Sequence, residues 1–187
     1  MTAFPPLAAM GRRIVILGPT NSGKSTLAEA ISRKLDIPAV HLDRFRHLPN
    51  TDWAVRPNPE FHALHDAAIA EMAWVMDGNY SVLLPQRFAR ATGVIVVNDH
   101  YLPRFGRYLR RTLFEPQRAG GLEGNRDSIK WQMLSWIWQT RNSIGRYRDF
   151  ATATGLPMAD CQSMADINAL YRHWGLTRPS ASAAPAG

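Results

Sequence analysis

Residues Arg13 to Ser25 read R-I-V-I-L-G-P-T-N-S-G-K-S, and the architecture of the chain follows from them. The first five residues, 13–17, are a mainly apolar run of the kind that is buried on both faces of a parallel sheet. Residues 18–25 match G-x-x-x-x-G-K-[ST], and a helical pattern over 24–35 follows at once. A strand, a glycine-rich turn and a helix in this order are the context that a phosphate-binding loop requires.

Each fixed position of this loop has a physical reason. Gly18 and Gly23 allow backbone conformations that a side chain blocks, so that successive N–H groups face an anion at the positive end of the helix. Lys24 supplies a cation between the β- and γ-phosphates of a nucleotide, and the Ser25 hydroxyl is a ligand for Mg²⁺. The nucleotide-binding residues expected in this stretch are Gly18, Thr20, Asn21, Ser22, Gly23, Lys24, Ser25 and Thr26.

Short β-branched runs alternate with helical patterns along the rest of the chain, which indicates an α/β fold with a mostly parallel sheet. Strands are expected at 13–17, 39–42, 74–76, 94–97 and 158–161, and helices at 24–35, 60–72, 103–114, 127–150 and 164–174. We expect one domain over 1–176 and a disordered tail over 177–187, where Pro, Ser, Ala and Gly predominate.

The charge of the chain is concentrated in one segment. The 187 residues include 22 Lys and Arg against 15 Asp and Glu, a formal charge of +7. Residues 104–148 contain ten basic and three acidic residues, which accounts for the whole excess. Such a segment indicates an anionic partner, either the phosphates of a nucleotide or a nucleic acid.

Several classes of protein are excluded by what the sequence lacks. Cys161 is the one cysteine, so no internal disulfide can form, and it is expected to be a small core residue. The six histidines show no spacing typical of a metal site or a catalytic triad. No apolar run approaches the roughly 20 residues that cross a bilayer. The N-terminus does not resemble a secretory signal, so a cytoplasmic protein is expected.

Two further motifs carry a resemblance to a known family. His41-Leu42-Asp43 follows the second strand, and residues 74–80 read W-V-M-D-G-N-Y at the third. Together with the loop and the arginine-rich residues 104–111, they resemble the adenylate-kinase-like P-loop proteins often labelled DNA topology modulation proteins. The resemblance spans about 12–174. It implies a three-layer kinase-type fold with strand order 2-3-1-4-5, ATP with Mg²⁺, and a helical arginine-rich lid at about 104–148.

The resemblance does not extend to the acceptor of adenylate kinases. Those enzymes carry D-G-F-P-R at the third strand, and its arginine grips both phosphates, whereas here Asp77-Gly78 is followed by Asn79-Tyr80-Ser81. Arg87 is the next arginine, and it either substitutes for the missing one or caps a helix. AMP is therefore not expected as the acceptor.

Two aspartates follow neighbouring strands. Asp77 ends the third strand, where parallel sheets present ligand sites, so we expect it to hold Mg²⁺ or orient its water. The alternative is an ordinary turn aspartate. Asp43 is expected to end the second strand and to hold an acceptor hydroxyl and take its proton. Its alternative is a surface pair with Arg44 or Arg46.

The arginines after the fourth strand form the expected lid. Arg104, Arg107 and Arg111 are spaced three and four apart, so one helix face can present them to a transferring phosphoryl group. The resemblance implies that Arg110 lies beside the nucleotide and that Arg141, on the following helix, makes a further phosphate contact. The alternative is a solvated basic helix surface. The aromatic residues within 131–138 suit either a nucleic-acid platform or, by their helical spacing, a core or dimer contact.

The short chain, the single phosphate loop and one arginine-rich segment favour a kinase over a switch or a motor. A guanine-selecting N-K-x-D motif is absent. We expect an ATP-dependent phosphotransferase that acts on a small-molecule or nucleotide acceptor. The expected catalytic residues are Lys24, Asp43, Asp77, Arg107 and Arg111. The alternative is a nucleotide-binding regulator or ATPase that contacts nucleic acid through 104–148. Oligomerisation is compatible with either.

Overall fold

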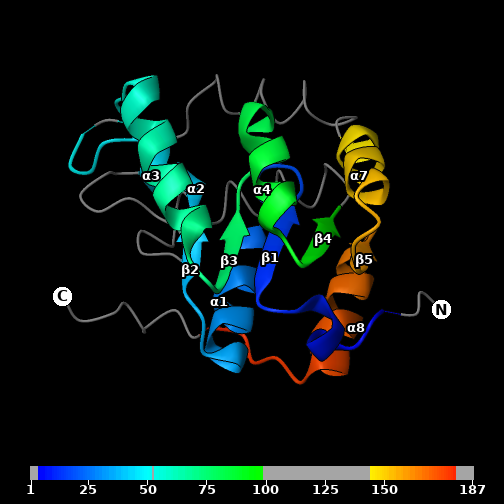
Figure 1. Ribbon diagram of the computed structural model, residues 1–187. Coiled ribbons are helices and arrows are strands. Elements are labelled where there is room, and N and C mark those ends of the chain that lie inside the picture. The colour runs from blue at the N-terminus through cyan, green and yellow to red at the C-terminus, as the bar shows by residue number, and fades with distance from the viewer. Residues whose placement is uncertain (1–3, 52, 99–143, 180–187) are drawn as a thin grey trace.

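The computed structural model describes residues 4–51, 53–98 and 144–179 of the chain. Five strands and the helices between them make up these ranges (Figure 1). In chain order the elements are η1 (Leu7–Met10), β1 (Arg13–Leu17), α1 (Lys24–Leu35), β2 (Ala39–His41), α2 (Leu42–Arg46), α3 (Asn58–Ala70), β3 (Trp74–Asp77), η2 (Ser81–Leu83), α4 (Leu84–Arg90), β4 (Gly93–Val97), α7 (Ile144–Ala153), β5 (Met158–Cys161) and α8 (Met164–Trp174).

The strands form one parallel sheet in the order β2-β3-β1-β4-β5. The expected fold class and strand order are therefore confirmed. β1 lies in the middle, so the loop that follows it emerges between β3 and β4. The order changes direction beside β1, and the end of a parallel sheet at such a point is where ligands of doubly wound folds bind.

Helices cover both faces of the sheet, as Figure 1 shows. Alternate residues of β1 supply the two cores, because successive side chains of a strand point to opposite faces. Ile14 and Ile16 belong to a cluster with residues of α1 and α8. Val15 and Leu17 belong to a second cluster with residues of α3, α4 and α7. All four side chains are fully buried, which explains why polar and apolar residues do not alternate along this strand.

Most expected elements in the described ranges lie where the sequence places them. The bounds of β1, α1, β5 and α8 are those expected. The helix expected at 60–72 runs from Asn58 to Ala70, because Pro59 fits the first turn of a helix, where no N–H partner is needed. β3 extends to Asp77, whose backbone pairs in register with Ile16. β4 begins one residue early, at Gly93.

Other expected elements lie partly or wholly outside the described residues. The helix expected over 127–150 is described only from Ile144, and there it continues to Ala153. The helix expected at 103–114, most of the expected lid and most of the tail lie outside the described residues. Within the described ranges, no helix combines the length and the apolar character needed to cross a bilayer.

Candidate functional site

The loop of residues 18–25 joins the end of β1 to the start of α1 and has the conformation its glycines predict. Gly18 has φ of 153°, and a Cβ atom there would lie 2.2 Å from the carbonyl oxygen of Val97. Gly23 is left-handed, with φ of 89°, and is the N-cap of α1. Asn21 also has a positive φ, of 62°. Alternation between right- and left-handed backbone turns successive N–H groups toward one point, which makes a concave anion site.

The side chains of the loop also fit a nucleotide phosphate. The Lys24 ammonium reaches back across the loop and donates to the Pro19 carbonyl at 2.7 Å. The positive charge of Lys24 is thus held at the concave anion site of the loop. The Ser22 hydroxyl is buried without a hydrogen-bond partner among the described residues. Thr20 lies within the loop and Thr26 follows it, and the Thr26 carbonyl accepts a hydrogen bond from Tyr171 of α8 at 3.2 Å.

A serine and a carboxylate meet at the end of this loop. The Ser25 hydroxyl donates to Oδ2 of Asp77 at 2.5 Å. Asp77 ends β3, directly beside β1, and is 5% exposed. Burial opposes its ionisation, but hydrogen bonds and the charge of His41 outweigh this and hold the pKa of Asp77 below its ordinary value. An ionised carboxylate beside a serine hydroxyl is an oxygen-rich pair of the kind that holds Mg²⁺ in phosphate loops.

His41 is a part of this site that the sequence reasoning missed. Its Nδ1–H donates to Oδ1 of Asp77 at 2.6 Å, and its Nε2–H donates to Glu29 of α1 at 3.0 Å. Burial disfavours the charged ring, but the two carboxylates outweigh it and raise the pKa of His41 to about 9. The hydrogen bond with His41 in turn lowers the pKa of Glu29. His41 is therefore a cation at neutral pH.

The sequence did contain a signal for His41. In the order 2-3-1, the end of β2 lies beside the end of β3, and His41 pairs in register with Asp77. Glu29 lies four residues after Ser25 on α1, so the two share one helix face. Spacing along the chain hides this cluster, because its members come from three different elements.

Asp43 lies elsewhere than expected. β2 ends at His41, and Asp43 is in the first turn of the short helix α2 rather than at the end of a strand. The reason is the buried side chain of Leu42, which belongs to the core beneath α3 and α4 and begins the helix. Asp43 accepts a hydrogen bond from the Tyr80 hydroxyl at 2.7 Å. Burial, together with the charge of Asp43, raises the pKa of Tyr80.

Arg46, one of the two surface partners considered for Asp43, has other partners. Its guanidinium donates to Asn58 at 2.7 Å and to the Arg56 carbonyl at 3.2 Å. It also lies over the ring of Phe61, 5.4 Å from the ring centre. Phe61 and Tyr80 are in tilted contact at 5.0 Å between ring centres. Tyr80 thus links Asp43 to the ring of Phe61.

The residues after Asp77 contact both the phosphate loop, through Asn79, and Asp43, through Tyr80. Asn79, which the sequence reasoning left without a role, accepts a hydrogen bond from the backbone N–H of Gly18 at 3.1 Å. Arg87 neither replaces the arginine of D-G-F-P-R at a phosphate nor caps a helix. It is fully buried and donates to the backbone carbonyls of residues 78–80.

At the end of β5, the polar side chains are paired with one another. Arg148 donates to both oxygens of Asp160, at 2.8 and 3.2 Å, and Gln162 donates to the same carboxylate at 3.0 Å. Cys161 is a buried free cysteine, as expected, and burial raises its pKa to about 12.

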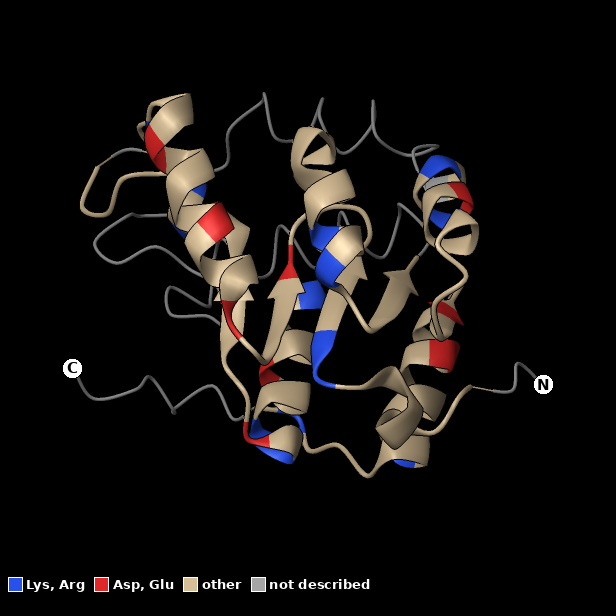
Figure 2. Ribbon diagram, viewed as in Figure 1, with Lys and Arg blue, Asp and Glu red and all other residues tan. Residues whose placement is uncertain are grey.

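The expected lid residues Arg104, Arg107, Arg110, Arg111 and Arg141 lie outside the described residues, as do the aromatic residues of 131–138. Figure 2 shows basic and acidic residues interspersed over the described elements. The concentrated positive charge that the sequence predicts therefore belongs mainly to the undescribed segment.

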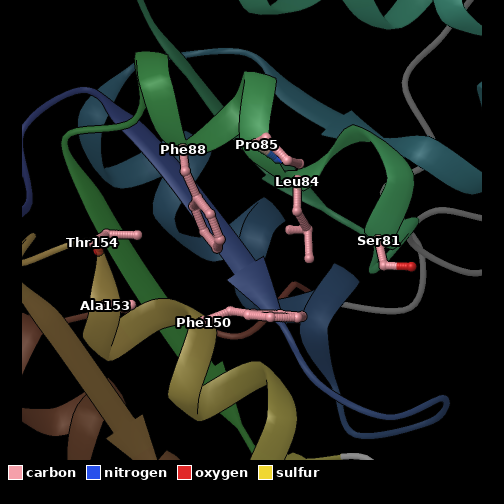
Figure 3. A pocket seen from close by; sticks show the side chains of 7 residues that line it. All are labelled: Ser81, Leu84, Pro85, Phe88, Phe150, Ala153 and Thr154. Carbon is pink, nitrogen blue, oxygen red and sulfur yellow. The ribbon is translucent and has the colours of Figure 1, made fainter.

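A hollow of about 300 Å³ lies between α4 and α7. Figure 3 shows its lining, to which Leu84 and Phe88 contribute from α4 and Phe150 from α7. Ser81 and Thr154 supply its hydroxyl groups, and among the described residues no carboxylate, imidazole or ammonium group lines it. It is an apolar hollow distinct from the phosphate loop.

Comparison with known proteins identifies the fold of the chain. No protein-family model matches the sequence, and no curated protein matches it. Among solved structures, shikimate kinase from Acinetobacter baumannii in complex with shikimate is similar over 90% of this chain and 96% of its own, with a TM-score of 0.51 at 12% identity. Shikimate kinase from Bacteroides thetaiotaomicron covers 86% of this chain and 97% of its own, with a TM-score of 0.49 at 17% identity. The chain has the P-loop kinase fold.

Proposed function

We propose that this chain is an ATP-dependent phosphotransferase that moves the γ-phosphate of ATP to a hydroxyl group of a small acceptor. The observation that carries the proposal is the joining of two half-sites by one short loop. The phosphate loop with Lys24, Ser25 and Asp77 lies on one side, and Asp43 with its aromatic neighbours lies on the other. Such a pairing suits phosphoryl transfer, which depends on positioning and charge stabilisation more than on covalent chemistry.

The residues have separate tasks in this proposal. The loop N–H groups and Lys24 bind the nucleotide phosphates, and Ser25 and Asp77 hold Mg²⁺. When bound, Mg²⁺ neutralises the charge that develops on the transferring phosphoryl group. Asp43 orients the acceptor hydroxyl and accepts its proton. The expected lid residues Arg107 and Arg111 stabilise phosphoryl charge, and Arg110 and Arg141 contact the nucleotide.

We further propose membership of the adenylate-kinase-like family often labelled DNA topology modulation proteins. The H-L-D and D-G-N-Y motifs support this proposal, because their residues His41, Asp43, Asp77, Asn79 and Tyr80 all lie in the site. A single cytoplasmic domain over 1–176 completes the proposal. No observation on the described residues favours the alternative of a regulator that contacts nucleic acid.

Purified protein with Mg·ATP and a panel of hydroxyl acceptors tests the proposal. The panel includes nucleosides, nucleoside monophosphates, sugars and hydroxy acids, with shikimate among them because the similar kinase binds it. Transfer of ³²P from the γ-position to at least one acceptor is expected. Release of phosphate to water at one rate, whatever acceptor is present, would contradict a kinase and favour an ATPase.

Asp43→Asn tests the acceptor half of the site. It is expected to lower the transfer rate by about 10²- to 10⁴-fold, the usual contribution of a positioned proton acceptor, with Mg·ATP affinity unchanged. Glu60→Gln is the matched control, since this acid lies on the exposed side of α3 and pairs with Arg56. Equal activity of the two variants would remove Asp43 from the reaction.

A further inference from the structure

Arg87 is a buried cation without a carboxylate partner among the described residues. Its side chain is fully buried beneath the loop after β3. Nη1 donates to the Gly78 carbonyl at 2.6 Å, and Nη2 donates to the carbonyls of Asn79 and Tyr80, the latter at 3.1 Å. Nε has no hydrogen-bond partner within the described ranges. Three consecutive carbonyls therefore take the place of a counter-ion.

Burying the charge of Arg87 lowers the stability of the fold, and this cost points to a role for the side chain beyond packing. Burial lowers the pKa of Arg87 to about 10, which still leaves the side chain charged at neutral pH. A buried charge destabilises a fold unless hydrogen bonds compensate for its lost hydration. An apolar residue of similar volume would fill the same space without that penalty. The cation is therefore better explained by what it does to the loop than by core packing.

The loop that Arg87 holds is itself conformationally strained. Gly78 has φ of 125°, and a Cβ atom there would lie 2.9 Å from Cβ of Leu42. Tyr80 has φ of 29°, an unfavourable value for a residue with a side chain. Backbone in such regions persists only when its surroundings fix it. The planar guanidinium, with several donors in a fixed geometry, is suited to fixing three carbonyls together.

The carbonyls of residues 78–80 accept hydrogen bonds from Arg87, while the side chains of Asn79 and Tyr80 contact the two half-sites. Asn79 accepts from the Gly18 N–H at the start of the phosphate loop. Tyr80 donates to Asp43 on the acceptor side. A shift of this short segment moves both contacts together, because they belong to adjacent residues.

We propose that Arg87 is a positioning residue that sets the nucleotide and acceptor halves of the site relative to each other. It acts through the carbonyls of 78–80, keeping Asn79 on the phosphate loop and Tyr80 on Asp43. The acceptor half of this inference rests on the proposed function. The nucleotide half depends only on nucleotide binding.

The test compares Arg87→Met and Arg87→Lys with Asn79→Ala and a matched control. Arg90→Met is the control, because Arg90 lies one turn further along α4 and donates to the exposed Ala70 carbonyl. Amide hydrogen exchange of Gly18 is followed by NMR, and the Kd of Mg·ATP is measured by calorimetry. Both Arg87 variants are expected to speed Gly18 exchange and weaken Mg·ATP binding about fivefold, as Asn79→Ala does, the value of about one hydrogen bond.

Two comparisons separate positioning from a general structural role. The double variant of Arg87→Met and Asn79→Ala should bind Mg·ATP no more weakly than Arg87→Met alone, because both changes remove one contact. Arg87→Lys keeps the charge but not the three-carbonyl geometry, so it should resemble Arg87→Met. For the acceptor half, the ¹³Cζ signal of Tyr80 should shift in Arg87→Met as it does in Asp43→Asn.

The inference is overturned by additive losses of affinity, or by Arg87 variants that lower stability and leave Gly18 exchange and the Tyr80 signal unchanged. It is also overturned if neither Arg87 variant gives a cooperative unfolding transition, since Arg87 is then needed for folding itself. None of these measurements requires phosphoryl transfer. Failure to find an acceptor would count against the proposed function and leave the result for Arg87 intact.

Discussion

At the scale of single residues, the site contains charged side chains that are buried and matched to one another. His41 lies between two carboxylates, and Asp77 lies between His41 and Ser25. Neither residue type is unusual at such a place, but the pattern along the chain does not reveal their contact. The sequence predicted Asp77 from its place at the end of a strand, whereas His41 required the register between two strands.

Because the pKa of His41 is raised, the free energy of unfolding should fall as the pH becomes alkaline. Its pKa rises from an ordinary 6.5 to about 9, so the stabilisation is fully present below about pH 6.5 and is lost as the pH rises through 9. The shift corresponds to about 3 kcal/mol of unfolding free energy. Urea unfolding at pH 6 and pH 10 should show this decline in the wild type and a smaller one in His41→Gln. Parallel declines in both proteins would contradict the assignment.

For His65 we expect the opposite pH dependence, a loss of stability at acid pH. It is fully buried on α3, with Nε2 unpartnered among the described residues, and burial lowers its pKa. A lowered pKa means that the unfolded chain takes up the proton first, so stability is lost as the pH falls below about 6.5. His65→Leu should flatten the acid limb of the stability profile between pH 7 and pH 5. A profile as steep as that of the wild type would rule His65 out as the cause.

At the scale of elements, the loop after β1 depends on how closely it packs against β4. The two loop glycines provide a matched comparison. A Cβ atom at Gly18 would lie 2.2 Å from the Val97 carbonyl, while a Cβ atom at Gly23 meets nothing within 4 Å. Both have positive φ, so both replacements carry backbone strain, but only one adds a collision with another strand.

Gly18→Ala should therefore destabilise the protein much more than Gly23→Ala. The latter is expected to cost about 1–2 kcal/mol, the strain of a left-handed residue with a side chain, and the former several kcal/mol more or a failure to fold. Chemical unfolding without nucleotide measures the difference and avoids any effect on phosphate binding. Equal losses would indicate that the contact between Gly18 and β4 has little energetic value.

Element by element, the sequence predicted most of what local patterns determine. The apolar run of β1 and the periodicity of α1 and α8 fix those elements from neighbouring residues alone. Asp43 was misplaced because the end of β2 is set by the burial of Leu42 in a distant core. The roles of Asn79, Tyr80 and Arg87 depend on three-dimensional contacts with the loop after β1, with α2 and with the loop after β3, which no periodicity encodes.

At the scale of the whole molecule, β1 links the two cores. Ile16 packs toward α1 and α8, and Leu17 packs toward the helices of the other face. Since one strand serves both layers, neither core is expected to unfold without the other.

Ile16→Ala and Leu17→Ala should each cost about 2–5 kcal/mol, the usual cost of truncating a fully buried aliphatic side chain. Each should also preserve a single transition. Far-ultraviolet circular dichroism and tryptophan fluorescence, recorded across the same urea series, should give coincident curves. Two separated transitions in either variant would show that the faces of the sheet unfold independently.

The hydrogen bonds around His41 close a circuit through three elements. Starting from Ser25 on α1, contacts run to Asp77 on β3, to His41 on β2, and back to Glu29 one turn further along α1. The helix that opens at the phosphate loop is thereby braced against the sheet at two points. Asp43 lies only two residues beyond His41, so the brace also fixes the place from which this side chain projects. For the proposed reaction, this means that nucleotide and acceptor would both have to fit a frame whose dimensions are set before either binds.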